Sequence, residues 1–357
     1  RSKVLQSTLQ KMTAHPSTRL IFGAAITIAI QSSSALTVML VGLVNSGIMQ
    51  LEQTVSVILG GNIGTTLTAW ILSLSGISGD SIFINLLKPE NFSPIVALIG
   101  VIMIMACNTQ KKKDIGGVFV GFAILMYGMT LMSGSVAPLA DMPEFTGILT
   151  AFNNPFLGVL VGLVFTGIIQ SSAASVGILQ ALSLTGCITY GMAIPLVMGL
   201  NIGTCATALL SSIGTTKNAR RVAIVHITGK IIGTVFCMIV FYALNAIIGF
   251  GFINSPLSAP EAALCHTVFN IITTIILLPA RKVLIKISRI VVRGNDAEQS
   301  EVFLDERLLL SPGLAVHESY NMAVKMSDIA RSCVLTAMGL MLSYDNDKAA
   351  DVKTEET

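Results

Sequence analysis

Two short polar segments of this 357-residue chain each occur twice. The segment QSSSA at 31–35 recurs as QSSAA at 170–174, and GGNIGTT at 60–66 recurs as GLNIGTC at 199–205. The spacing is 139 residues for both pairs, and residues 31–72 match residues 170–211 at 14 of 42 positions. Low complexity gives scattered matches but not two polar clusters in one register, so we infer an internal duplication.

The residue types in these segments suit the binding of an oxyanion together with a small hard cation. Hydroxyl residues are favoured at helix N-termini, where free N–H groups and a partial positive charge bind anions without Arg or Lys. The hydroxyl residues that would open half-helices are Ser33, Ser34, Thr65, Thr66, Ser172 and Thr204. Amide and carbonyl oxygens are hard neutral ligands that suit sodium. The amide candidates are Gln31, Asn62, Gln170 and Asn201.

The four clusters contain no carboxylate. A desolvated cation there would lack a counter-charge unless the anion supplies it, which favours coupled binding of cation and anion. Small polar residues in membrane helices also serve tight packing. Repetition of the same polar residues at one spacing favours a binding site over packing alone.

The composition shows which elements must position these residues. Hydrophobic residues make up 53% of the chain and charged residues only 11%, against about a quarter charged in soluble domains. No charged residue occurs from Phe145 to Thr216. At roughly 20 residues per spanning helix, this predicts an all-α polytopic membrane protein. It excludes a soluble globular enzyme, a disordered chain and a nucleic-acid binder.

Basic residues near the ends of apolar runs predict how the chain crosses the bilayer. Two helical hairpins with QSS at the join, at 18–47 and 156–186, are too short in each arm to span and are predicted to be re-entrant. The predicted crossings are 53–79, 93–107 and 115–137 in the first unit and 191–213, 219–249 and 260–280 in the second. Three crossings per unit is an odd number, so the sequence predicts two inverted-topology repeats.

Each NIGT segment is expected to break its spanning helix, which gives each repeat a re-entrant hairpin and a broken transmembrane helix. Non-helical backbone at membrane depth survives only where protein or a water-filled cavity surrounds it. Breaks near the midplane at a repeat interface are typical of transporter binding sites.

The predicted domains follow this threading. The first membrane repeat is 1–142, the second inverted repeat is 143–293, a linker follows at 294–310, and a cytoplasmic helical region begins at 311–357. At the spacing of 139, the partner of the span 115–137 would lie before Arg1. We therefore expect a further N-terminal helix that the given chain lacks.

The paired QSS and NIGT motifs resemble those of the sodium-dependent phosphate cotransporter family, the type II Na/Pi symporters and their bacterial relatives. The similarity runs from about His15 to Arg281. The resemblance implies that phosphate is bound by Gln31, Ser32, Ser33, Ser34, Thr65, Thr66, Gln170, Ser171, Ser172 and Thr204. It implies sodium ligands at Asn62 and Asn201, with the two glutamines as further candidates. Ala173 and Cys205 depart from the family's hydroxyl residues, so only backbone contacts are expected there.

The resemblance implies a secondary active transporter that couples sodium, as the co-transported ion, to inorganic phosphate by alternating access. It implies no enzymatic activity and a multi-pass protein of the plasma membrane, the inner membrane if bacterial, with a cytoplasmic C-terminus. The region after 311 resembles the start of a PhoU-like domain. A symporter of another small oxyanion and a membrane phosphate sensor are the alternatives, and a homodimer is one arrangement that the sequence leaves open.

Three further polar residues lie in apolar stretches. His226 and His266 are each followed four residues later by a polar residue, Lys230 and Asn270. We expect the histidines to form inter-helix hydrogen bonds, with a protonation-linked response as the alternative. Lys230 is expected to extend to the cytoplasmic surface.

Overall fold

A computed structural model describes residues 15–76, 89–138, 154–294 and 312–341, with a few isolated positions outside these ranges. Its regular structure is helical throughout the described ranges, apart from one isolated bridge between Thr189 and Pro256. The first half contains α2 (Pro16–Ile30), α3 (Ser33–Asn45), α4 (Leu51–Ser73), the short 3-10 helix η1 (Leu74–Gly76), α6 (Pro89–Ala106) and α7 (Gln110–Val136). The second half contains α9 (Pro155–Ile169), α10 (Ser172–Ser183), α11 (Tyr190–Gly203), α12 (Cys205–Ser211), α13 (Lys217–Ile248), α14 (Ala259–Leu277), α15 (Arg281–Val291) and α16 (Pro312–Leu340).

The helix boundaries repeat at the spacing found in the sequence. Helices α2 and α9 begin and end 139 residues apart, as do the starts of α3 and α10 and the starts of α4 and α11. Gly47 and Gly186, which follow α3 and α10, both have a φ of 75°, a left-handed conformation that glycine adopts without a side-chain clash. The duplication therefore extends from the sequence to the turns.

Glycines set the close packing of the hairpins on the central helices. A Cβ on Gly60 of α4 would overlap the carbonyl oxygen of Leu20 in α2. The equivalent Gly199 of α11 lies in the same way against the carbonyl oxygen of Val159 in α9. Small residues allow two backbones to approach this closely. These glycines therefore place each QSS turn beside the central helix of its own repeat.

The two halves are held together around α4, α10 and α14. The buried Gln180 of α10 donates to the carbonyl oxygens of Ala69 in α4 at 2.9 Å and Ala259 in α14 at 3.1 Å. The indole Nε1 of Trp70 in α4 donates to the hydroxyl of Thr267 in α14 at 3.0 Å. These contacts fix the first central helix against elements of the second repeat.

Burial separates the central helices from the peripheral ones. In the apolar window of α4, 72% of the residues are buried, whereas only 17% are buried in that of α13 and 22% in that of α7. Apolar side chains exposed over whole helices are unfavourable in water but stable in hydrocarbon. Five helices of the described ranges are long and apolar enough to cross a membrane, namely Leu51–Gly76, Gln110–Met132, Tyr190–Ser211, Lys217–Ile248 and Ala259–Leu277. The chain is a multi-pass membrane protein.

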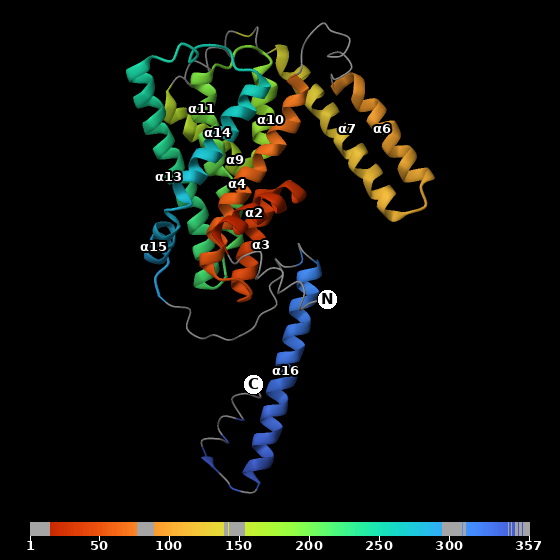
Figure 1. Ribbon diagram of the computed structural model, residues 1–357, viewed down its shortest axis with the longest axis vertical. Coiled ribbons are helices and arrows are strands. Elements are labelled where there is room, and N and C mark those ends of the chain that lie inside the picture. The colour runs from red at the N-terminus through yellow and green to blue at the C-terminus, as the bar shows by residue number, and fades with distance from the viewer. Residues whose placement is uncertain are drawn as a thin grey trace.

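Basic residues gather at one end of the bundle. Arg289 of α15 forms an ion pair with Glu52 at the start of α4 at 2.7 Å. Arg221 near the start of α13 donates to the carbonyl oxygen of Val292 at 3.2 Å. The sequence predicts that both arginines lie on one side of the membrane, and the structure brings them to one end of the bundle. Figure 1 shows α16 beyond this end and the α6–α7 pair at one side of the bundle.

The predicted break at NIGT is wrong for the first repeat. Helix α4 runs without interruption through 60–66. The Thr65 hydroxyl donates to the Gly61 carbonyl at 2.9 Å, and the Thr66 hydroxyl donates to the Ile63 carbonyl at 2.7 Å. These hydroxyls are satisfied within the helix, and the glycines serve packing. In the second repeat Thr204 alone separates α11 from α12, and its backbone has helical angles.

Candidate functional site

The two QSS turns line one small polar cavity. Its volume is about 90 Å³, which exceeds the space that one water molecule needs. It is lined by Gln31, Ser32, Ser33, Ser34, Thr65, Gln170, Ser171, Ser172 and Ala173. Eight of the ten residues that the sequence proposes for the anion lie here, while Thr66 and Thr204 do not. Segments 139 residues apart thus meet at one place.

The glutamine at each turn has an unusual backbone conformation. Gln31 has φ 57° and ψ 26°, and Gln170 has φ 58° and ψ 18°. Each N–H donates to a threonine carbonyl four residues earlier, at 2.7 Å for Gln31 and 2.6 Å for Gln170. This left-handed region costs an L-residue about 1–2 kcal/mol, and such outliers cluster at functional sites. The glutamines end α2 and α9 and aim the next helices at the cavity.

The serine after each glutamine caps the following helix. The Ser32 hydroxyl accepts from the N–H of Ala35 at 3.1 Å, and the Ser171 hydroxyl accepts from the N–H of Ala174 at 3.2 Å. The N–H groups of the two intervening residues in each turn have no acceptor within the helix. Those residues line the cavity, and they are Ser33, Ser34, Ser172 and Ala173.

The electrostatics of the cavity follow from two helix N-termini rather than the four predicted. Each N-terminus carries about half a positive charge. Helix α4 is unbroken at NIGT, and Thr204 at the start of α12 does not line the cavity, so α3 and α10 contribute their free ends. A phosphate group carries roughly −1.5 to −2 charges near neutral pH. The helix ends therefore leave the anion incompletely neutralised and favour the presence of cations.

The two glutamine side chains differ in their partners. The Gln31 amide donates to the Ile28 carbonyl at 2.7 Å, and its oxygen accepts from the Thr68 hydroxyl at 2.5 Å. The side chain of Gln170 makes no hydrogen bond to any described residue. Gln31 is thus held in one orientation, whereas the Gln170 amide is available to a ligand.

The two asparagines proposed as sodium ligands also differ. Both are buried, with 5% of Asn62 and 3% of Asn201 exposed. The Asn62 side chain has no hydrogen-bond partner in the described part of the chain. The Asn201 oxygen accepts a hydrogen bond from Nζ of Lys230 at 2.8 Å. The equivalent positions of the two repeats therefore have different surroundings.

The expected surface position of Lys230 is wrong. Only 4% of this residue is exposed, and its ammonium also donates to the Asn270 oxygen of α14 at 3.1 Å. Lys230 follows Lys217 by 13 residues, or about 20 Å of helix at 1.5 Å per residue, which is too far for its side chain to reach that end. The distance of Lys230 from the start of its helix was therefore the sequence signal that this residue is buried. The contact with Asn201 depends on packing between helices, which the sequence does not give.

The histidine prediction also differs from the structure. Both ring nitrogens of His266, which is 1% exposed, lack a hydrogen-bond partner among the described residues, and so does Nδ1 of His226. The expected inter-helix hydrogen bond is therefore wrong for His266. Buried polar groups are nearly always satisfied, so these imidazoles are exceptions to that rule.

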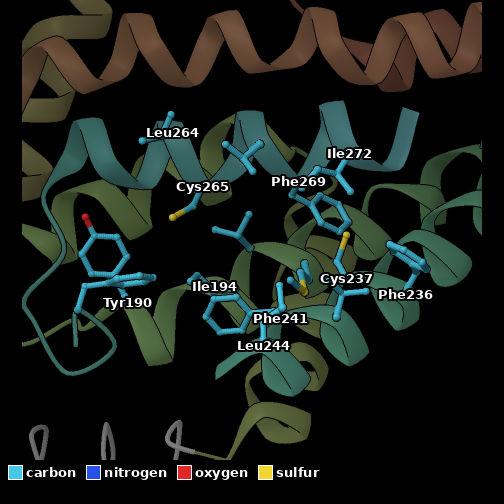
Figure 2. A pocket seen from close by; sticks show the side chains of 15 residues that line it. Tyr190, Ile194, Phe236, Cys237, Phe241, Leu244, Leu264, Cys265, Phe269 and Ile272 are labelled. Atoms are coloured by element: carbon cyan, nitrogen blue, oxygen red, sulfur yellow. The ribbon is translucent and has the colours of Figure 1, made fainter. Parts of the chain in front are cut away.

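A second cavity, of about 310 Å³, lies between α11, α13 and α14. Figure 2 shows that its labelled lining is carbon and sulfur apart from the Tyr190 hydroxyl. Apolar walls offer no hydrogen-bond donors to an oxyanion. A charge buried there without hydrogen bonds is strongly unfavourable. The larger cavity therefore does not suit a phosphate-like anion, and the small polar cavity does.

A protein-family model matches most of the chain. The model of the family described as Na+/Pi-cotransporter matches residues 1–134 and again residues 124–259. The chain belongs to the Na+/Pi-cotransporter family. This is a family of phosphate transporters, and its double match agrees with the duplication of the QSS and NIGT segments.

Relatives in this family differ in the names they carry. YqeW of Bacillus subtilis, named only as uncharacterized, is 28% identical over 276 residues, which cover 77% of this chain and 84% of YqeW. The putative inorganic phosphate export protein YjbB of Escherichia coli is 25% identical over 86% of this chain, which spans 54% of YjbB. Human sodium-dependent phosphate transport protein 2B is 30% identical over 39% of this chain and 19% of its own length. No solved structure matches the chain.

Proposed function

We propose that this chain is a sodium-coupled symporter of inorganic phosphate. The observation that carries the proposal is the single polar cavity formed by both QSS turns. Four free N–H groups and the surrounding hydroxyls can donate to phosphate oxygens, while the amide oxygens of Asn62 and Gln170 can bind sodium. Similarity to a protein named for sodium-dependent phosphate transport supports the choice of ions.

We further propose that the two repeats are inverted in the membrane and that the hairpins α2–α3 and α9–α10 are re-entrant. Their arms have 15, 13, 15 and 12 residues, whereas a spanning helix needs about 20. The cavity would then lie near the midplane at the repeat interface, where alternating access of a secondary transporter can expose it to either side. The basic end of the bundle would be cytoplasmic.

Uptake of ³²P-phosphate into proteoliposomes tests the proposal. The wild type should accumulate phosphate only with an inward sodium gradient. Gln31→Ala and Gln170→Ala should each reduce uptake, while Gln110→Ala, at an exposed position on α7, should match the wild type. Uptake that persists without sodium, or wild-type behaviour of both glutamine variants, would contradict the proposal.

Phosphate export is a second candidate, favoured by the name of YjbB, which is similar to 86% of this chain. The cavity binds the same anion in either direction, so the two functions differ in coupling rather than in the site. Efflux from phosphate-loaded vesicles that needs no sodium on either side of the membrane would favour export. Competition by sulfate would indicate a broader oxyanion specificity, and absence of labelled-phosphate counterflow would indicate a sensor.

A further inference from the structure

The two repeats differ at the position where each presents its asparagine. In the first repeat the Asn62 amide has no side-chain partner within the described ranges. In the second repeat the Asn201 oxygen already binds a cation, because Nζ of Lys230 lies 2.8 Å away. Lys230 lies beyond residues 170–211, the part of the second repeat that matches the first. The two matching asparagines therefore differ in whether a fixed positive charge binds them.

Both acceptors of Lys230 are oriented for it. The amide nitrogen of Asn201 donates to the Val197 carbonyl at 3.0 Å, and that of Asn270 donates to the His266 carbonyl at 2.9 Å. Each amide therefore turns its oxygen toward the ammonium, an assignment that the hydrogen-bond network decides. Two oriented neutral oxygens around one positive charge are what a desolvated sodium ion also requires.

The Lys230 charge is not neutralised by an acidic side chain. The ion pair in the described ranges is the one between Arg289 and Glu52 at the basic end, and Lys230 has two neutral amides. A buried charge without a paired opposite charge is unfavourable. A co-transported oxyanion would supply that opposite charge, as it would for a sodium ion.

We propose that the Lys230 ammonium is a tethered cation that takes the place of one transported sodium ion at Asn201. This inference rests on the proposed sodium-coupled transport of phosphate. The chain then moves one sodium ion fewer per phosphate than it would with a neutral residue at position 230, because Lys230 supplies one positive charge that never leaves the protein. Sodium binds at the Asn62 side, where the amide has no tethered partner.

The test is a double-label measurement of ²²Na and ³²P uptake by the full chain in proteoliposomes. Lys230→Asn replaces the ammonium by a neutral polar side chain, and Lys286→Asn, at an exposed position of α15, is the control. The sodium-to-phosphate ratio should rise by one in Lys230→Asn and stay at the wild-type value in Lys286→Asn. An active Lys230→Asn protein with the wild-type sodium-to-phosphate ratio would overturn the inference and assign Lys230 a structural role.

A second measurement applies if Lys230→Asn does not transport. Its melting temperature in detergent, compared in sodium and in N-methylglucamine, should depend more steeply on sodium than that of the wild type, and an equal dependence would overturn the inference. In the wild-type background, Asn62→Ala should raise the half-saturating sodium concentration at least tenfold, whereas Asn201→Ala should change it less than twofold. Equal effects of the two substitutions would overturn the inference. Absence of sodium-dependent uptake in the wild type would instead refute the proposed function itself.

Discussion

Replacement of Gln170 by glycine and by alanine separates the backbone role of this residue from its side-chain role. The left-handed backbone of Gln170, with φ 58°, costs about 1–2 kcal/mol for any L-residue. Glycine removes that cost but adds about 0.4–1 kcal/mol of unfolded-chain entropy. Gln170→Gly should therefore be as stable as the wild type or slightly more stable, and Gln170→Ala should keep the strain.

Both variants lose the amide that has no partner among the described side chains. A hydrogen bond to a charged group contributes about 1.5–3 kcal/mol, which corresponds to about a 10- to 160-fold change in affinity at 1.36 kcal/mol per factor of ten. The half-saturating phosphate concentration for uptake should rise within that range in both variants. The assays are thermal unfolding in detergent and initial rates of ³²P-phosphate uptake. Wild-type affinity in Gln170→Gly with reduced affinity in Gln170→Ala would refute a role for the amide and assign the effect to the backbone.

Three other substitutions test the packing around the site. Gly199→Ala should lower the free energy of unfolding by about 1–3 kcal/mol, because the added Cβ would overlap the backbone of α9. The control Gly117→Ala, at a glycine that faces open space, should not lower it. Equal melting temperatures of the two variants would contradict the close packing of α11 on α9. Gln180→Leu should cost about 1–3 kcal/mol in thermal unfolding because two carbonyls lose their donor, and an unchanged midpoint would argue against that link. Thr68→Val should weaken phosphate uptake about fivefold by releasing the Gln31 amide, and unaltered half-saturation would show that its orientation does not matter.

The sequence predicts the hairpins well because their signals are local. Pro16 and Pro155 lie at the start of α2 and α9, and the serines that follow the QSS glutamines cap the next helices. Proline in the first helical turn and serine at an N-cap act within a few residues. Because each local signal occurs in both repeats at one spacing, it supports the prediction twice.

The NIGT prediction failed in the first repeat because the same residues can break or pack a helix. Glycine weakens a helix in isolation by roughly 1 kcal/mol, but Gly60 and Gly64 of α4 lie against the backbone of α2. The Thr65 hydroxyl is satisfied by its own helix. Tertiary packing therefore overrides the local preference, and the sequence alone does not contain that contact.

The most direct test of the central claim is the structure of the full chain in lipid nanodiscs with sodium and phosphate, determined by cryo-electron microscopy. The claim is that both QSS turns bind one anion between the N-termini of α3 and α10. The account predicts tetrahedral density within hydrogen-bond distance of the free N–H groups of Ser33 and Ser172. Density for phosphate elsewhere in the protein, with these two turns apart or in contact only with water, would contradict it.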